Sequence, residues 1–209
     1  MTMPTIDDLV ADLRPVRRLS PHAGLGLTFA MLLLVTALVL GIFGPRDDVA
    51  SMRPAVIVLL RGGLCLLLGV AASVAVVAAA RPGVGARRDG WQWALAAAAL
   101  IPAASLWLTM AGDGVREPVS FYGPACLVIS LVSALLIGSA LVVWLRRGAV
   151  TDPVRAGWLV GLAAGALGTF AYSLHCPTTT VHFVALWYSL TIAVSSAIGR
   201  LAVPRLLHW

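Results

Sequence analysis

The stretch GPACLVISLVSALLIGSALVVWL, from Gly123 to Leu145, contains no charged residue and is long enough to cross a hydrocarbon core of about 30 Å as one helix. Similar apolar runs recur along the chain, and the short separators between them contain Pro or Gly, which end helices. We therefore predict an all-α membrane protein with six transmembrane helices, at about Ala23–Gly44, Ala55–Ala80, Trp91–Ala111, Gly123–Leu145, Ala156–Cys176 and Val181–Pro204.

The composition supports this prediction. Of the 209 residues, 60% are hydrophobic and only 11% are charged, whereas a soluble domain carries roughly a quarter charged residues. The net charge of +6 is the difference between 15 basic and 9 acidic residues. All the basic residues are arginine, and they are spread between the apolar runs. This spread is typical of charges that orient helices beside an anionic membrane. We expect the lipid bilayer as a partner and no direct contact with nucleic acid.

The arginines also predict the orientation of the helices. Eleven of them fall on one side of the predicted spans and three on the other, which places both termini in the cytoplasm. The larger group is Arg14, Arg17, Arg18, Arg81, Arg87, Arg88, Arg146, Arg147, Arg155, Arg200 and Arg205, and the smaller one is Arg46, Arg53 and Arg116. The chain then divides into a cytoplasmic tail, residues 1–22, and a six-helix transmembrane domain, residues 23–209.

Motifs for catalysis are absent from the sequence. It contains no Gly-rich phosphate loop, no Gly-x-Ser-x-Gly, no His-Glu-x-x-His and no Cys-x-x-Cys. The carboxylates Asp47, Asp48, Asp113 and Glu117 all fall in predicted outer loops rather than at the middle of a span, where a proton-coupled transporter usually has one. We expect no enzyme, no catalytic residue and no cofactor. Two facing histidines for a haem are also not expected, because only a tight loop separates His175 from His182.

Arg61 is the one charged residue well inside a predicted span, because Arg200 lies only four residues before the cytoplasmic end of the sixth span. We expect its side chain to extend to the outer interface, where Asp113 or Glu117 would pair with it. A sharper alternative is that Arg61 favours a thiolate at Cys65, which lies four residues on and so on the same helix face. In the fifth span Gly157, Gly161 and Gly165 repeat at intervals of four, which is typical of close helix packing within the chain or between two copies.

Cys126 and Cys176 are expected at the same depth. The fourth and fifth spans form an antiparallel hairpin, with Cys126 20 residues before Arg146 and Cys176 21 residues after Arg155. At about 1.5 Å per residue, both thiols lie about 30 Å from the connecting loop, at the outer surface. Disulfides are permitted in that compartment. The alternative is that both are unrelated small apolar residues.

The tail has the pattern of an amphipathic helix. Ile6, Leu9, Val10 and Leu13 fall at i, i+3, i+4 and i+7, and Pro15 ends the pattern. A helix of this length is too short to be stable alone in water. We expect it to form against a partner groove or the membrane face, or else to remain a frayed leader.

The sequence resembles the negative regulator of sigma F family. The resemblance lies in Asp7 to Leu19 (DDLVADLRPVRRL), in Leu-His-Cys-Pro at 174–177 with Phe183 to Tyr188 (FVALWY), and in Pro204 to Trp209 (PRLLHW). It covers the whole chain. Members of that family are anti-sigma factors of the bacterial inner membrane. The resemblance therefore implies an extracytoplasmic-function sigma factor as the partner of the tail, and outward-facing cysteines that sense stress.

The resemblance also assigns roles to residues of this chain. The partner-binding residues would be Asp12, Leu13, Arg14, Pro15 and Val16, together with Leu9 and Val10 of the apolar stripe. The sensing residues would be Cys126 and Cys176, with His175 and His182 as further candidate metal ligands. Members often have an acidic residue after His-Cys-Pro, where this chain has Thr178 and so lacks an oxygen ligand.

Cys65 matches no motif of the family. Two other classes of function remain as alternatives, a small transporter or channel and a membrane thiol oxidoreductase. A transporter should have a polar path at the midplane, and an oxidoreductase should have a vicinal cysteine pair with a quinone pocket. The oligomeric state does not follow from the sequence.

Overall fold

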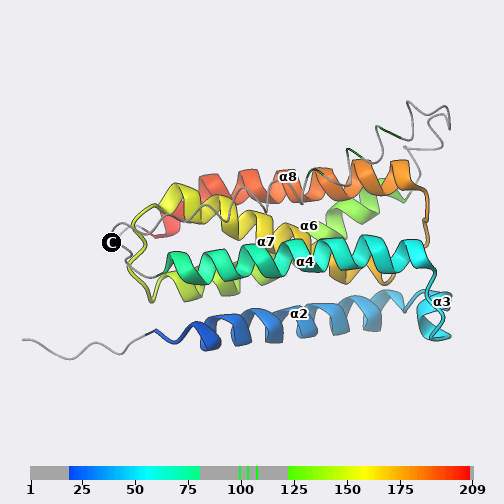
Figure 1. Cartoon of the computed structure of the whole chain (residues 1–209), viewed down its shortest axis with the longest axis horizontal. Coiled ribbons are helices and arrows are strands. Elements are labelled where there is room, and N and C mark those ends of the chain that lie inside the picture. Colours follow the sequence, from blue (N-terminus) through cyan, green and yellow to red (C-terminus); the bar gives the residue numbers. More distant parts are fainter. Residues whose placement is uncertain (1–18, 81–98, 100–102, 104–106, 108–121, 208–209) are drawn as a thin grey trace, which may run out of the picture.

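A computed structural model describes residues 19–80, 99, 103, 107 and 122–207, and the regular secondary structure of these residues is helical throughout. Figure 1 shows the helices side by side, most of them running along the long axis of the molecule. The helices are α2 (Pro21–Phe43), α3 (Asp47–Ala50), α4 (Val56–Ala79), α6 (Gly123–Leu145), α7 (Pro153–Ser173) and α8 (Val181–Leu206).

Five of these helices are long and apolar enough to cross a membrane, namely all except the short α3. They confirm five of the predicted spans, with ends that differ by at most three residues. The proline and glycine breakers explain the agreement, because Pro21 and Pro153 begin their helices and Gly44 follows the end of α2. The predicted span Trp91–Ala111 lies outside the described residues, apart from Ala99, Ala103 and Trp107, which are helical.

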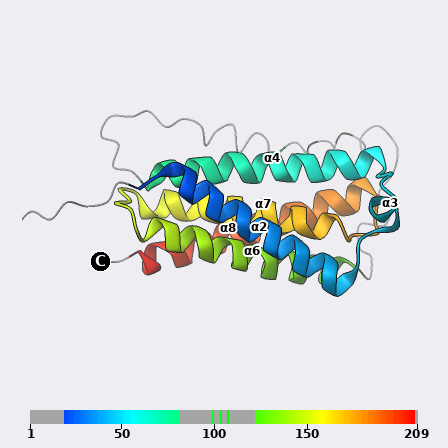
Figure 2. The ribbon, with the colours of Figure 1, turned by 90° about the horizontal axis from the view of Figure 1, so that it is seen from below.

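Helix α7 occupies the centre of the bundle. It packs against α8, α4 and α6, whereas α2 lies at the edge against α6 and α7; Figure 2 shows α7 between α4 and α6, with α2 crossing them. The start of α2 and the end of α8 lie at one end of the bundle, and α3 lies at the other. We call the first the tail end. The other is the cysteine end, because Cys126 and Cys176 lie there.

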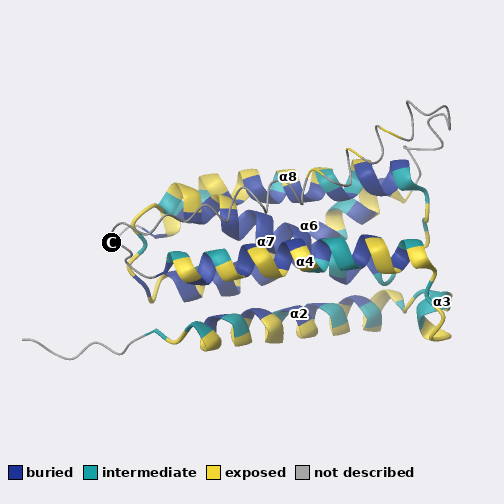
Figure 3. Ribbon diagram, viewed as in Figure 1, coloured by how far each residue is buried: buried dark blue, intermediate teal, exposed yellow. Residues whose placement is uncertain are grey.

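The outer faces of the bundle are apolar. Large hydrophobic side chains such as Ile42, Leu67 and Leu201 are more than half exposed, and in Figure 3 the exposed residues cover the outward sides of α2, α4 and α8. Water would oppose the exposure of so many apolar residues, but lipid chains solvate them. The five described spans therefore have the surface expected of a multi-pass membrane protein.

The glycine repeat of α7 packs against α8 within the same chain. A Cβ atom at Gly157 would lie 2.5 Å from the carbonyl oxygen of Gly199, and one at Gly161 would overlap the backbone of Ser195. The two backbones therefore touch along a seam of Gly157, Gly161 and Gly199, as small residues permit in membranes. Of the two uses that the sequence left open for these glycines, packing within the chain is the one observed.

Candidate functional site

The cysteine end holds a cluster of buried side chains that includes all three cysteines. Cys126 lies in the first turn of α6 and Cys176 in the turn that follows α7, and neither is exposed. They pack in one cluster with Tyr172, Phe183, Val184, Tyr188 and Cys65. All three are free thiols. The structure therefore brings together the two cysteines that the sequence placed at one depth, and it adds Cys65 of α4.

Both thiols are buried at the end of the bundle where the sequence predicts them. Cys126 and Cys176 are each 0% exposed, because the aromatic rings of Tyr172, Phe183 and Tyr188 surround them. A count of residues along a helix gives depth but not the direction in which a side chain points. The cysteines lie at the expected end of the bundle, but they face its interior.

Arg61 is buried beside this cluster, so the predicted extension to the interface is wrong. Its side chain in α4 is 2% exposed. Its Nη2 donates hydrogen bonds to the carbonyl oxygens of Ser173, at 3.2 Å, and Cys176, at 2.9 Å. Its Nη1 donates to the carbonyl oxygen of Thr178. The guanidinium thus satisfies backbone carbonyls at the C-terminus of α7, where a helix has unpaired acceptors and a partial negative charge.

The ring of Tyr188 completes the surroundings of Arg61. The guanidinium carbon lies 5.9 Å from the centre of that ring, within the range of a cation–π contact. Asp113 and Glu117, the carboxylates expected to pair with Arg61, lie outside the described residues. Within the described part of the chain, backbone carbonyls and an aromatic face hold this buried cation.

A second arginine reaches the same turn from the loop after α2. Nη1 of Arg46 donates to the carbonyl oxygens of Cys176, at 3.0 Å, and Pro177, at 2.8 Å. Its Nε lies 2.6 Å from Oδ1 of Asp48. The other carboxylate oxygen, Oδ2, accepts a hydrogen bond from the Ala55 N–H. Desolvation works to raise the pKa of Asp48, but the Ala55 N–H and the charge of Arg46 hold that pKa below its ordinary value of 3.8.

The histidines of this region take structural positions. Nδ1 of His175 lies 2.9 Å from the carbonyl oxygen of Gly44, and its ring contacts the rings of Phe43 and Tyr172. His182 is buried at the start of α8. Among the described residues no three His, Cys, Asp or Glu side chains come together as a metal site. The candidate ligand set of Cys126, Cys176, His175 and His182 therefore does not form a site of three or four ligands here.

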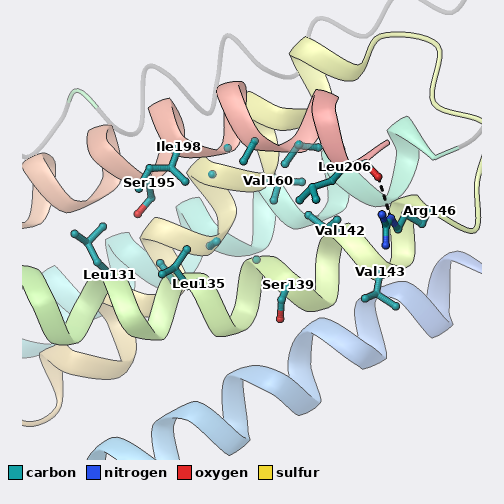
Figure 4. A pocket seen from close by; sticks show the side chains of 17 residues that line it. Leu131, Leu135, Ser139, Val142, Val143, Arg146, Val160, Ser195, Ile198 and Leu206 are labelled. Atoms are coloured by element: carbon teal, nitrogen blue, oxygen red, sulfur yellow. Dashed lines mark hydrogen bonds between the residues drawn. The ribbon is translucent and has the colours of Figure 1, made fainter. Parts of the chain in front are cut away.

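An apolar groove lies away from this cluster, toward the tail end. It has a volume of about 300 Å³ and runs between α6, α7 and α8. Figure 4 shows its lining, with Leu131 and Leu135 on α6 facing Ser195 and Ile198 on α8. At its end Nε of Arg146 donates to the carbonyl oxygen of Leu206, at 2.9 Å. This mostly apolar lining differs from the polar midplane path expected of a transporter.

Residues 1–18 lie outside the described residues, and with them all the partner-binding residues expected from the sequence, Leu9, Val10, Asp12, Leu13, Arg14, Pro15 and Val16. The amphipathic helix of the tail therefore stays a prediction.

Comparison with known proteins finds the same family over nearly the whole chain. The family model described as "Negative regulator of sigma F" matches residues 9–209. The chain is 33% identical to the "Anti-sigma-F factor NrsF" of Caulobacter vibrioides, over 98% of this chain and 97% of that protein. It is 28% identical to the "Probable anti-sigma-F factor NrsF" of Azospira oryzae, over 83% of each chain. No solved structure matches. The chain belongs to the negative regulator of sigma F family, whose members are regulatory proteins and not enzymes.

Proposed function

We propose that this protein is an anti-sigma factor that holds an extracytoplasmic-function sigma factor through its N-terminal tail and releases it when Cys126 and Cys176 react. The observation that carries the proposal is the extent of the family match. It begins at residue 9, at the apolar stripe of the tail, and includes both cysteines. The anti-sigma-F relatives are similar over the same length.

The proposed orientation places both termini in the cytoplasm of the bacterial cell, with the protein in the inner membrane. The excess of arginines in the loops and termini that the sequence analysis assigns to one side supports it, because basic loops stay in the cytoplasm. Reporter fusions after residue 20, after residue 148 and at the C-terminus should all indicate the cytoplasm. A fusion at either terminus that reports the outer compartment would overturn the orientation, and the sigma factor could not then reach the tail.

Sequestration would use the apolar stripe of the tail. Leu9 and Leu13 lie on one face of the predicted helix, and burying a leucine contributes about 1.5–3 kcal/mol. Because such a short helix is unstable alone, it would gain its order only in the complex. Inhibition then follows from occupation of the sigma factor, with no chemical step at the tail.

The double substitution Leu9→Asp, Leu13→Asp tests sequestration. It places charges in the proposed interface, and we expect weakening by about 100-fold or more, since two buried leucines are lost and about 1.4 kcal/mol corresponds to tenfold. The readout is derepression of the target promoter with unchanged membrane abundance. Ala11→Asp adds one such negative charge to the opposite helix face and should keep repression. Full repression by the leucine double variant would sink the proposal.

Sensing would use the two thiols at the cysteine end. In a disulfide step the two S–H groups lose two protons, and two electrons pass to a two-electron oxidant such as a peroxide as the S–S bond forms. In a metal step two protons are released and two thiolates bind a soft cation. The proximity of Cys126 and Cys176 in one buried cluster supports either step. Either bond would favour the bundle geometry that accommodates it, at the expense of the resting one.

Serine substitutions test the sensing step in cells. Cys126→Ser and Cys176→Ser, alone and together, should keep repression and lose induction by oxidant or by thiophilic metal. Cys65→Ser is the matched control for a buried thiol of the same cluster that the family motif does not include. Full induction in the double variant would show that this pair does not sense.

A further inference from the structure

Two guanidinium groups converge on one backbone oxygen, the carbonyl of Cys176. Nη2 of Arg61 lies 2.9 Å from it and Nη1 of Arg46 lies 3.0 Å from it. The two arginines come from different parts of the fold, Arg61 from within α4 and Arg46 from the loop after α2. Two like charges on one acceptor repel each other, so the arrangement persists only where the surroundings hold it.

The surroundings supply several acceptors for these charges. The carbonyls of Ser173 and Thr178 also accept from Arg61, and that of Pro177 also accepts from Arg46. All of them lie at the C-terminal end of α7 or in the turn behind it, where the helix dipole is negative. The carboxylate of Asp48 holds Arg46 from its other side. The two arginines thus fasten residues 173–178 to α4 and to the α2–α4 loop.

The two cysteines differ in what fixes their backbone. Cys126 is in regular helix, and its N–H donates to the carbonyl of Tyr122 at 2.9 Å. Cys176 lies beyond the last residue of α7, where the helical ladder has ended, and only its N–H still bonds back, to Tyr172 at 3.1 Å. Beyond that bond, the side chains of Arg61 and Arg46 hold its carbonyl. The position of one thiol therefore depends on a helix, and that of the other on two arginines.

We infer that Arg61, assisted by Arg46, is a positioning residue for Cys176 that sets the approach of its thiol to that of Cys126. The inference rests on the proposed sensing function for its meaning in the cell, but the positioning itself can be measured on the purified protein. Arg61 contributes more than Arg46, because it is buried and bonds three carbonyls, whereas Arg46 is partly exposed. Lysine cannot replace it, since one ammonium lacks the planar fork that reaches several carbonyls at once.

The test measures how readily one reagent bridges the two thiols. The full-length protein carries Cys65→Ala, so that two thiols remain, and it is held in lipid nanodiscs. Phenylarsine oxide is the probe: two S–H bonds break, two As–S bonds form and the arsenic-bound oxygen leaves as water, with no net oxidation. The readout is intact mass after challenge with a competing monothiol, which removes singly attached arsenic but spares the bridged form.

We expect Arg61→Gln and Arg61→Lys to lower the affinity for the bridging arsenical by at least about tenfold, because the second bond depends on the local concentration of the second thiol. Arg46→Gln should lower it by a smaller factor. Arg200→Gln is the matched control, since Arg200 stacks on Trp158, 5.6 Å from its ring centre, at the tail end. The Arg200→Gln protein should bind the bridging arsenical with the affinity of the parent protein.

A second control separates positioning from general loss of stability. Leu141→Ala empties space in the core cluster nearer the tail end, where Leu141 is 1% exposed, and should lower the melting temperature without changing the bridging affinity. Bridging at the parent affinity in both Arg61 variants overturns the inference, and so does an equal loss in Leu141→Ala. If Arg61→Gln does not accumulate, Arg61→Lys and Arg46→Gln carry the test.

The outcomes for the cell and for the purified protein are independent. Failure of the serine variants to abolish induction would remove the sensing function, while the arsenical result would still decide whether Arg61 positions Cys176. Conversely, serine variants that lose induction beside Arg61 variants that bridge normally would keep the sensing function and reject the role of Arg61.

Discussion

The two ends of the α7–α8 pair are held together by different means. Toward the tail end Gly157 and Gly161 of α7 meet Gly199 and Ser195 of α8, and backbone touches backbone. Toward the cysteine end the partners are large side chains, Tyr172 on α7 with Phe183 and Tyr188 on α8, and the connecting turn is held by arginine hydrogen bonds. The seam is fixed by the shape of the backbone, and the cysteine end by side-chain contacts.

This difference indicates that the cysteine end of α7 and α8 can rearrange more easily than the glycine seam. A backbone seam has no rotamers to exchange, so a displacement there must separate the helices. Aromatic rings and guanidinium hydrogen bonds can rearrange individually. Chemistry at the cysteines would therefore alter their own end first and move α7 and α8 as one unit at the other end.

Breaking the seam should give the largest effect on stability. Gly161→Ala places a methyl group against the carbonyl oxygen of Ser195 and the Cα of Ser196. Because these are backbone atoms, neither helix can yield without moving away. We expect a loss of about 3 kcal/mol or more, at the upper end of the usual cost of overpacking. Denaturant unfolding in mixed micelles, followed by tryptophan fluorescence, is the measurement.

Gly63→Ala is the matched control for this substitution. It also lies in a membrane helix, but among the described residues no atom outside its own stretch of helix lies within 4 Å of the position that its Cβ would take. Alanine should therefore be neutral or stabilise by up to about 1 kcal/mol through its helix propensity. If the two alanine variants unfolded alike, the close approach of α7 and α8 would not be what holds this pair together.

Substitutions at the cysteine end should change stability less than Gly161→Ala does, and at Tyr188 the substitution should increase stability. Among the described residues the hydroxyl of Tyr188 has no hydrogen-bond partner, although its ring packs on the cluster and on Arg61. Tyr188→Phe removes the unpaired hydroxyl and keeps the ring. We expect stabilisation by about 1 kcal/mol, the lower part of the range for a buried unsatisfied group.

Thr191→Val on the same helix provides the comparison. Its hydroxyl does have a partner, the carbonyl of Trp187 at 2.9 Å, so its removal should be neutral or slightly destabilising. A clear loss of stability in Tyr188→Phe would contradict the prediction and indicate that this hydroxyl has an acceptor beyond the described residues.

Much of the fold follows from the sequence, because apolar runs and breakers are local signals. The sequence predicts that α6 begins at Gly123 and ends at Leu145, and the structure has the helix within the same bounds. The grouping of Cys126 with Cys176 also follows, since counting from a shared loop measures depth on a hairpin. The partner of the glycine repeat does not follow, because spacing describes one face and leaves the facing helix open. The structure identifies that helix as α8.

The site was only partly predictable. The partners of Arg61 are backbone carbonyls more than 110 residues away, and a carbonyl leaves no mark in the sequence. The sequence therefore predicts a carboxylate partner for Arg61, because only side chains can be identified from it. The sequence does not predict that Cys65 joins the other two cysteines, because it lies nine residues after the start of α4 and shares no loop with them. Its spacing of four from Arg61 was the one available signal.

The smallest expected effect concerns the ionic contact at the rim of the cysteine end. Asp48 has a lowered pKa in the folded protein, because the Ala55 N–H and Arg46 favour its charged form against the opposing effect of desolvation. Its contribution to stability is therefore complete above its ordinary pKa of 3.8, and is lost as the pH falls through the lower value of the folded state. The contact is partly exposed and screened by salt, so the contribution is small.

The measurement is the melting temperature of the parent and of Asp48→Asn between about pH 2.5 and 6, at low and at high salt, since the relevant carboxyl groups titrate in that range. The difference between the two proteins should shrink as the pH falls and should also shrink at high salt. Asp152→Ala, which removes the N-cap oxygen that accepts the Arg155 N–H at 2.9 Å at the tail end, should lose stability without changing the arsenical bridging of Cys126 and Cys176. If Asp48→Asn also leaves bridging unchanged, Arg46 does not need the carboxylate of Asp48 to hold the turn at Cys176. The position of that turn then depends on Arg61 and the carbonyls to which it donates.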